Sequence, residues 1–365
     1  MQHCINVGVD LHDRTMVLRW ASDREAARAA SFSSDREGQE RMVKLFADRR
    51  RQVGGARVFF AYEASSQGFG LYDRLTEAGF ECAVLAPTRM SRSPQQKSNK
   101  DDGRDALGIL HLLRAHVLAG CGLPAVWVPQ PQTRDDRELV RARLDLADKL
   151  TALKNQVQML LKRNHLRRPA GLGKGWTRAY RAWLRGLAGP GGALAPGARA
   201  ALGTLLVQMG TVEEQIEVMD QKLRGLRGQE RYAAPVAHLL KLKGVGLLTA
   251  MVFLTEMGRM DRFENRRQIG AYLGLVPASY ESGQAQDRKG HISRHGPGRV
   301  RRALCQAVWA RVRTDDSARA AYKRICDKNP KHKKKAVVAL MRRLAVRMWH
   351  RALDAQQRAP ALAVA

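Results

Sequence analysis

Short apolar runs separated by polar turns characterise the first 130 residues of the chain. Apolar positions alternate with polar or glycine positions over residues 5–9, and the run 15–20 follows a short polar turn, which predicts two antiparallel strands. Further short strands are predicted over 57–62 and 80–85, with helical spacing between and after them. Prolines then mark a linker. The pattern therefore predicts an α/β domain over residues 1–130.

Helical spacing dominates the rest of the chain. A charged helix is predicted over 134–167, and a second helix follows whose apolar positions alternate spacings of three and four, a coiled-coil pattern. These positions are Leu202, Leu205, Met209, Val212, Ile216, Met219, Leu223 and Leu226. Two such helices can pair within the chain, across a dimer, or both. We expect a helical coiled-coil domain over 131–232, a helical C-terminal domain over 233–352 and a disordered tail over 353–365. The fold class is α/β plus all-α.

The charge balance of the chain points to a polyanionic partner. Lys and Arg number 64 against 34 Asp and Glu, which gives a formal net charge of +30. No apolar stretch approaches the length of a transmembrane helix, and the N-terminus lacks the order of a signal peptide. We therefore expect a cytoplasmic protein that binds nucleic acid and no membrane.

Four acidic residues occupy special places in this basic chain. Asp10 and Glu63 end two predicted strands, and Asp102 and Asp105 lie three apart, on one face at the start of a predicted helix. If these elements are neighbours, the four carboxylates converge, and divalent cations must neutralise them. Oxygen ligands select Mg²⁺ or Mn²⁺. Taken singly, each acid is also explained as a turn residue or, for Asp101 or Asp102, as a helix cap.

A resemblance to a known family rests on motifs near both ends of the chain. The first set is Val7–Asp10, Tyr62–Glu63 and Lys100–Ala106, and the second is Gly270–Pro277, Tyr280–Gly283, Gly290–Ser293 and Gly296–Arg302. Together they resemble the insertion-sequence-110 family of transposases. The resemblance implies a RuvC-like, RNase H-like N-terminal domain with a DEDD metal site made of Asp10, Glu63, Asp102 and Asp105. The family usually has Thr or Ser at the position of Asp101.

A serine in a glycine-bounded segment is the second candidate centre. By its residues alone Ser282 reads as a turn residue, but the family resemblance places the catalytic serine in the step Ser282-Gly283, with Ser279 as the alternative. The stretch from Arg288 to Arg302 is basic and free of acids, which suits phosphate contact. Its basic residues are Arg288, Lys289, Arg294, Arg299, Arg301 and Arg302.

The resemblance also implies an activity and a set of partners. It implies a recombinase that excises and inserts a mobile element by strand exchange through a phosphoserine intermediate. It further implies donor and target DNA, a structured guide RNA (bridge RNA) encoded by the element, and a dimer or tetramer with composite active sites. Two other interpretations of the residues remain open. One is a RuvC-like nuclease that only cuts, and the other is a non-enzymatic nucleic-acid-binding protein.

Overall fold

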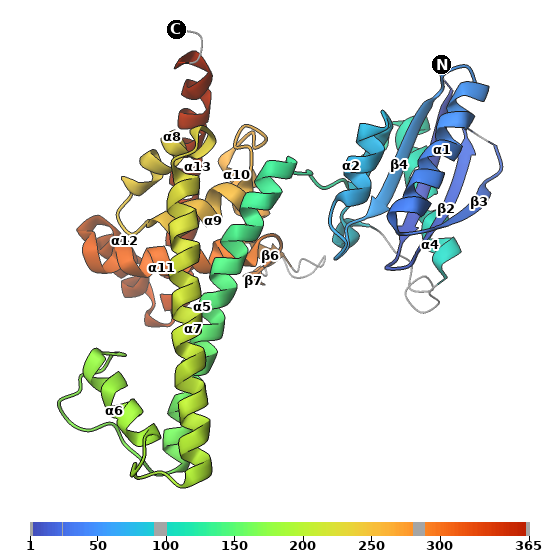
Figure 1. The fold of residues 1–365 in the computed structure, drawn as a ribbon. Coiled ribbons are helices and arrows are strands. Elements are labelled where there is room, and N and C mark those ends of the chain that lie inside the picture. Colours follow the sequence, from blue (N-terminus) through green and yellow to red (C-terminus); the bar gives the residue numbers. More distant parts are fainter. Residues whose placement is uncertain (1–2, 24, 91–100, 280–288, 363–365) are drawn as a thin grey trace. The chain divides into compact units, whose positions relative to one another are not determined.

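The computed structural model describes residues 3–23, 25–90, 101–279 and 289–362 (Figure 1). The chain divides into two compact units, Met1–Pro129 and Gln130–Ala365. The first is a mixed α/β unit, and the second is mainly helical. The division lies at the proline-marked linker that the sequence predicts. None of the described helices has an apolar stretch long enough to cross a membrane.

A five-stranded mixed sheet forms the centre of the first unit. Its strands are β1 (Cys4–Leu11), β2 (Thr15–Ser22), β3 (Arg28–Ser33), β4 (Arg57–Glu63) and β5 (Glu81–Leu85), in the order β3-β2-β1-β4-β5. β1 is antiparallel to β2 and parallel to β4, and β4 is parallel to β5. The four predicted strands are confirmed. The edge strand β3 was not predicted, because Phe32 is its single large apolar residue.

Helices cover both faces of this sheet. They are α1 (Arg36–Gln52), α2 (Gly70–Glu77) and α4 (Asp102–Ala119), with the short 3-10 helix η1 (Pro87–Arg89) after β5. Met42 and Phe46 of α1 pack with Phe60 on one face. Ile109 and Leu113 of α4 pack with other sheet residues on the opposite face. The second of these cores holds α4 against the sheet.

Gly8 sets how closely α4 approaches β1. A Cβ at Gly8 would lie 2.3 Å from the carbonyl oxygen of Ala106 and 2.5 Å from the backbone nitrogen of Leu110. Real Cβ atoms do not come this close to backbone, so any larger residue would push the helix away. Because Asp10 lies two residues after Gly8 and α4 begins four residues before Ala106, this contact fixes the acids of both elements near each other.

The second unit is built on two long helices that pair within the chain (Figure 1). They are α5 (Pro131–Arg163) and α7 (Pro196–Arg227), and α6 (Arg178–Ala188) packs against their far end. Leu202 and Met209 of α7 pack with Val157 and Leu160 of α5. Of the alternatives that the sequence leaves open, pairing within the chain is therefore realised, while Ile216 in the middle of the seam is only half-buried.

The remaining elements of the second unit form a helical C-terminal core. They are α8 (Glu230–Leu240), α9 (Leu247–Met257), α10 (Arg266–Tyr272), β6 (Pro277–Ser279), β7 (Lys289–Ile292), α11 (Gly298–Thr314), α12 (Asp316–Lys328), η2 (Pro330–His332) and α13 (Lys333–Leu362). The boundary expected at residue 232 does not separate two cores. Val140 of α5 and Leu223 of α7 share one apolar cluster with α8, α9, α11 and α13. Buried Asp136 accepts hydrogen bonds from Arg231 and from Tyr232 Oη.

The last described helix extends into the segment 353–365, for which the sequence predicts a disordered tail. α13 continues through Leu362, and Ala352 and Ala355 are buried. Gln356 Oε1 accepts a hydrogen bond of 3.1 Å from the backbone nitrogen of Met260, and Trp349 Nε1 donates one of 2.9 Å to the Met260 carbonyl. Small apolar residues and one amide therefore anchor a segment whose composition looks unstructured.

The packing of α5 against α7 predicts that a charge placed in their contact destabilises the protein. Met209 is 2% exposed and its neighbour Val207 is 70% exposed. Met209→Glu should lower the free energy of unfolding by about 3 kcal/mol or more, because it buries an unpaired carboxylate. Val207→Glu should leave stability nearly unchanged. Thermal unfolding measures the difference, and sedimentation velocity on both variants separates stability from assembly. Equal melting temperatures of the two variants would contradict the pairing.

Candidate active site

The ends of β1 and β4 bring two of the predicted acids to one edge of the sheet. The parallel register pairs Val9 with Tyr62, so Asp10 and Glu63, the next residues along the two strands, emerge side by side. Both are half-buried. Glu63 also has an interaction partner of its own. The sheet therefore places two carboxylates together without help from any loop.

The start of α4 adds the other acids, and there the adjacent residues Asp101 and Asp102 have different roles. Asp101 is the N-cap, and its carboxylate accepts hydrogen bonds from the backbone nitrogens of Gly103 at 2.8 Å and Arg104 at 3.3 Å. Asp102 and Asp105 follow in the first turn of the helix. Since the Asp101 carboxylate is occupied by the cap, the helix offers Asp102 and Asp105 for other chemistry.

One histidine links β1 to α4. His12 Nε2 lies 3.0 Å from Asp10 Oδ2 and 3.3 Å from Asp102 Oδ1. One ligand atom from each of these three residues lies within 4.8 Å of the others. The side chains of Asp102 and His12 are about half exposed, whereas that of Asp10 is mostly covered. The cluster is thus anchored on its covered side and open on the other.

Electrostatics around Asp10 favour a nearby cation. Burial raises the pKa of Asp10 above its ordinary value, and the charge and hydrogen bond of His12 act in the opposite direction. The neighbouring charges of Asp105 and Asp102 raise this pKa further. An ionised Asp10 is therefore disfavoured in the folded protein, and a positive ion beside it would relieve that cost.

The candidate serine lies outside the described residues, as does Arg288. The flanking strands β6 and β7 are antiparallel, with Pro277 opposite Ile292. Ser279, the alternative to Ser282, lies in β6, where its backbone pairs with Lys289. The two candidates are thus distinguished by their positions, one within a strand and the other between two strands.

Three of the basic residues predicted to contact nucleic acid already have partners within the second unit. Arg301 Nη1 donates to the carbonyl oxygens of Leu273, His295 and Gly296, at 3.2, 2.8 and 3.1 Å. Arg301 therefore holds the turn before α11 in place.

Two further arginines of α11 make ion pairs with α5. Arg299 lies 3.3 Å from Asp145, and Arg302 pairs with Asp148. All four side chains are about half exposed, so these pairs contribute little stability and a phosphate could compete for the arginines.

A basic groove of about 990 Å³ lies beside the β6–β7 hairpin. Its lining includes Arg267 of α10, Arg294 after β7, and Lys335 and Arg342 of α13. Of these, Arg294 belongs to the basic segment predicted from the sequence, and Lys335 ends the basic run 328–335, for which the sequence also favours phosphate contact. Arg267 and Arg342 were missed, because a charged helix ordinarily indicates a solvated face.

Comparisons with known proteins agree with this arrangement. A model of DEDD transposases of the IS110 type matches residues 7–165, which hold all four acids, and a model described as the transposase IS116/IS110/IS902 family matches residues 236–323. The chain belongs to the IS110 family of transposases. The family resemblance seen in the sequence is confirmed.

Relatives of this IS110-family protein include several transposases. It is 34% identical to the putative transposase y4qE of Sinorhizobium fredii, over 69% of this chain and 58% of that protein. It is 24% identical to the transposase for insertion sequence element IS1533 of Leptospira borgpetersenii, over 85% of this chain and 86% of that one. It is 26% identical to the IS1111A transposase of Coxiella burnetii, over 64% and 60%. The chain thus spans less than two thirds of the length of the first of these relatives.

Membership of a DEDD family implies a divalent metal, and the donor set of this IS110-family protein fits one. Carboxylate oxygens of Asp10 and Asp102 and one imidazole nitrogen of His12 lie together, with the Asp105 charge near Asp10. His12 was missed by the sequence interpretation. The signal for it was the spacing Asp10-Leu11-His12, which turns both polar side chains to the same face of a strand.

Thermal unfolding should reveal metal binding without any activity. Without metal at neutral pH, Asp10→Asn should be as stable as the wild type or more stable. The raised pKa means that an ionised Asp10 costs stability once the pH exceeds that pKa, and the amide removes this cost. Saturating Mn²⁺ should raise the melting temperature of the wild type by about 5 °C and that of Asp10→Asn far less. Asp101→Asn keeps the cap and should keep the full shift. An equal shift in all three proteins would refute the site.

Proposed function

We propose that this IS110-family protein is a DNA transposase that excises and inserts a mobile element by strand exchange. The observation that carries the proposal is the meeting of Asp10, at the end of β1, with Asp102, at the start of α4, while the strand register places Glu63 at the neighbouring strand end. A mixed sheet with acids at these ends supports an RNase H-like, RuvC-like domain over 1–130, and the α5–α7 pair supports a coiled-coil helical domain after it.

Asp10, Glu63, Asp102 and Asp105 form the proposed metal site, and His12 is added to it as a neighbour. Hard oxygen ligands favour Mg²⁺ or Mn²⁺. A bound divalent ion would supply Lewis-acid stabilisation of the charge that develops on the phosphodiester oxygens. The half-buried Asp10 anchors the site, and the more exposed Asp102 and His12 face the side from which DNA would approach.

Ser282 is the proposed nucleophile. Its hydroxyl oxygen forms a bond to phosphorus while one phosphorus–oxygen bond to the DNA sugar breaks. The hydroxyl proton passes to a base, and the departing sugar oxygen takes up a proton. The phosphoserine link conserves the energy of the phosphodiester, so that rejoining needs no ATP. Family membership and the strands β6 and β7 on either side of residues 280–288 support this role.

The basic character of the chain supports the proposed partners. We infer that donor and target DNA and an element-encoded guide RNA bind to the basic surface of this chain, whose formal net charge is +30. Lys289, Arg294, Arg299 and Arg302 are the proposed phosphate contacts, together with Arg288. Arg301 is the weakest of the predicted set, because three carbonyl oxygens already occupy one of its nitrogens.

Assembly and location in the cell also belong to the proposal. The family resemblance implies a dimer or tetramer, with the carboxylates from one subunit and the serine from another. Within the cell we place the protein in the cytoplasm with the nucleoid, where its DNA substrates lie.

One reconstitution tests the proposed function against its two rivals. Purified protein is incubated with donor and target DNA, the transcript of the non-coding region beside the gene, and Mg²⁺. Junction-specific amplification should detect recombinant DNA, and a chelator should abolish it. Cleaved DNA without joined product would favour the nuclease. Binding without any strand cleavage would favour a non-enzymatic protein.

A further inference from the structure

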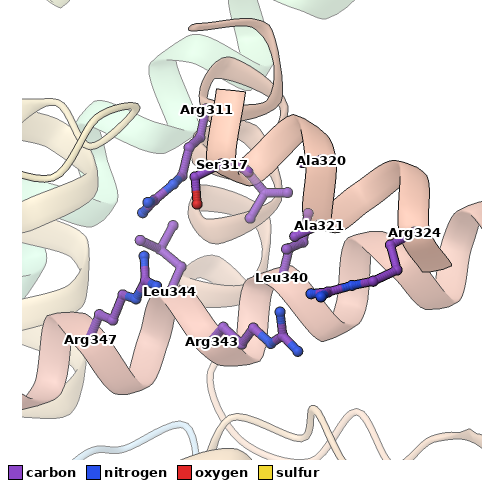
Figure 2. A pocket seen from close by; sticks show the side chains of 11 residues that line it. Arg311, Ser317, Ala320, Ala321, Arg324, Leu340, Arg343, Leu344 and Arg347 are labelled. Carbon is purple, nitrogen blue, oxygen red and sulfur yellow. The ribbon is translucent and has the colours of Figure 1, made fainter. Parts of the chain in front are cut away.

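A second, smaller pocket lies between α11, α12 and α13, apart from the groove beside the hairpin (Figure 2). Its volume is about 380 Å³. Four arginines line it, from three different helices: Arg311, Arg324, Arg343 and Arg347. In Figure 2 their side chains extend toward the cavity, and the hydroxyl of Ser317 points into it as well. Segments distant in the sequence thus gather hydrogen-bond donors around one space.

One of these arginines pairs with an acid, and in the described part of the chain the other three do not. Arg311 pairs with Asp315, at 2.8 Å, and both side chains are mostly covered. Among the described residues, no carboxylate pairs with Arg324, Arg343 or Arg347. Gathered like charges repel one another, and a bound anion would offset that repulsion. Arginines whose stems merely cover apolar surface would spread toward solvent, whereas these face one cavity.

The lining identifies the chemical class of the anion. Guanidinium groups and a hydroxyl are the donors that proteins use to hold phosphate, and Arg can do so with two parallel hydrogen bonds. The floor of the pocket is aliphatic, with Leu340 and Leu344. The described residues that line it include no aromatic ring on which a base could stack. These features suit a phosphate group and do not suit a nucleobase.

The pocket and the basic groove share part of their lining. Arg343 and Arg347 line both spaces, so guanidinium donors of α13 lie between the pocket and the groove beside the β6–β7 hairpin. An isolated phosphate would need only the pocket. Neighbouring basic spaces that share donors match the evenly spaced phosphates of a nucleic-acid strand.

We propose that the pocket of Arg311, Ser317, Arg324, Arg343 and Arg347 holds one backbone phosphate of a nucleic-acid strand that lies across α13 into the groove. This anchor goes beyond the proposed function, because it needs neither the metal site nor Ser282. It fixes the register of the strand relative to the β6–β7 hairpin, and it reads no base.

Binding of the full chain to a labelled oligothymidine, without divalent metal, tests the proposal. The double substitution Arg324→Gln with Arg343→Gln should weaken binding about tenfold. It should also reduce the slope of log affinity against log salt by about 0.7, the contribution of one single-strand phosphate. The matched control, Arg313→Gln with Lys323→Gln, removes two exposed charges from α11 and α12 outside the pocket. The control should stay within about twofold of the wild type. Equal losses in the two double variants would overturn the proposal.

Two further arms identify the source of the phosphate and exclude misfolding. An oligouridine of equal length should lose affinity to the same extent, because the pocket contacts phosphate and not the sugar. A third outcome is that inorganic phosphate stabilises the wild type while the two double variants bind both oligonucleotides with equal affinity. That outcome would indicate a site for a free anion and would overturn the strand anchor. The pocket variant should melt no lower than the wild type, since its substitutions remove repulsion. Because no metal is present, the binding result stands whether or not recombination is detected.

Discussion

Asp102→Asn should abolish strand exchange, with a loss of about a thousandfold or more, whereas Asp101→Asn should retain most of it. The two residues are adjacent and the chemical change is the same, so each variant is the control for the other. The Asp101 carboxylate accepts hydrogen bonds from the backbone nitrogens of Gly103 and Arg104, and Asn caps a helix equally well. The Asp102 carboxylate instead faces His12 and Asp10.

The measurement is recombinant junction formed per unit time at saturating RNA and DNA. Both variants should keep the helical circular dichroism and melting behaviour of the wild type, so a loss cannot be attributed to unfolding. Asp10→Asn and Glu63→Gln should behave like Asp102→Asn, because all belong to the proposed metal site. The reverse ranking, with an active Asp102→Asn and an inactive Asp101→Asn, would move the metal ligand by one position.

Ser282→Ala should form no covalent adduct with DNA and no recombinant product, while Ser279→Ala should do both. The substitution removes one hydroxyl and no charge, so binding of RNA and DNA should persist. Denaturing gels with labelled target DNA detect the adduct, and peptide mapping locates it. An adduct on Ser279, or full activity of Ser282→Ala, would refute the assignment.

Mixing two inactive proteins adds a separate readout for the same centre. Ser282→Ala supplies intact carboxylates, and Asp10→Ala supplies an intact serine. Recovery of activity in the mixture would mean that the two halves of the site come from different subunits. Activity that stays absent in the mixture, although each protein still assembles, would place both halves in one subunit.

Strong local patterns account for the parts of the fold that the sequence predicts. The strands β1, β2, β4 and β5 carry dense apolar runs, and the seam of α7 has unbroken spacing. The edge strand β3 has one large apolar side chain, so nothing local marks it. The end of α13 is held by Met260, some 90 residues earlier, through contacts that no local pattern reveals.

The candidate site also contains residues that the sequence predicts and residues that it does not. Its acids stand out because they are few and end predicted elements, and the structure brings Asp10 and Asp102 together. His12 is marked in the sequence only by its spacing from Asp10, and its place in the site rests on its distances to both acids. The pairs of Arg299 with Asp145 and Arg302 with Asp148 join residues 154 positions apart. Such pairings depend on which helices pack, and this the sequence does not specify.

The length of the paired helices α5 and α7 sets how far α6 lies from the helical C-terminal core. With 33 and 32 residues they are nearly equal in length, and each rises about 50 Å. Adding or removing one heptad in both helices together would shift α6 by about 10 Å and keep every apolar contact in phase. A change in only one helix would put the seam out of register. Relatives could therefore differ in the length of this helix pair by whole heptads added to or removed from both helices. A designer could lengthen or shorten the pair in the same way while leaving the apolar clusters at its two ends unchanged.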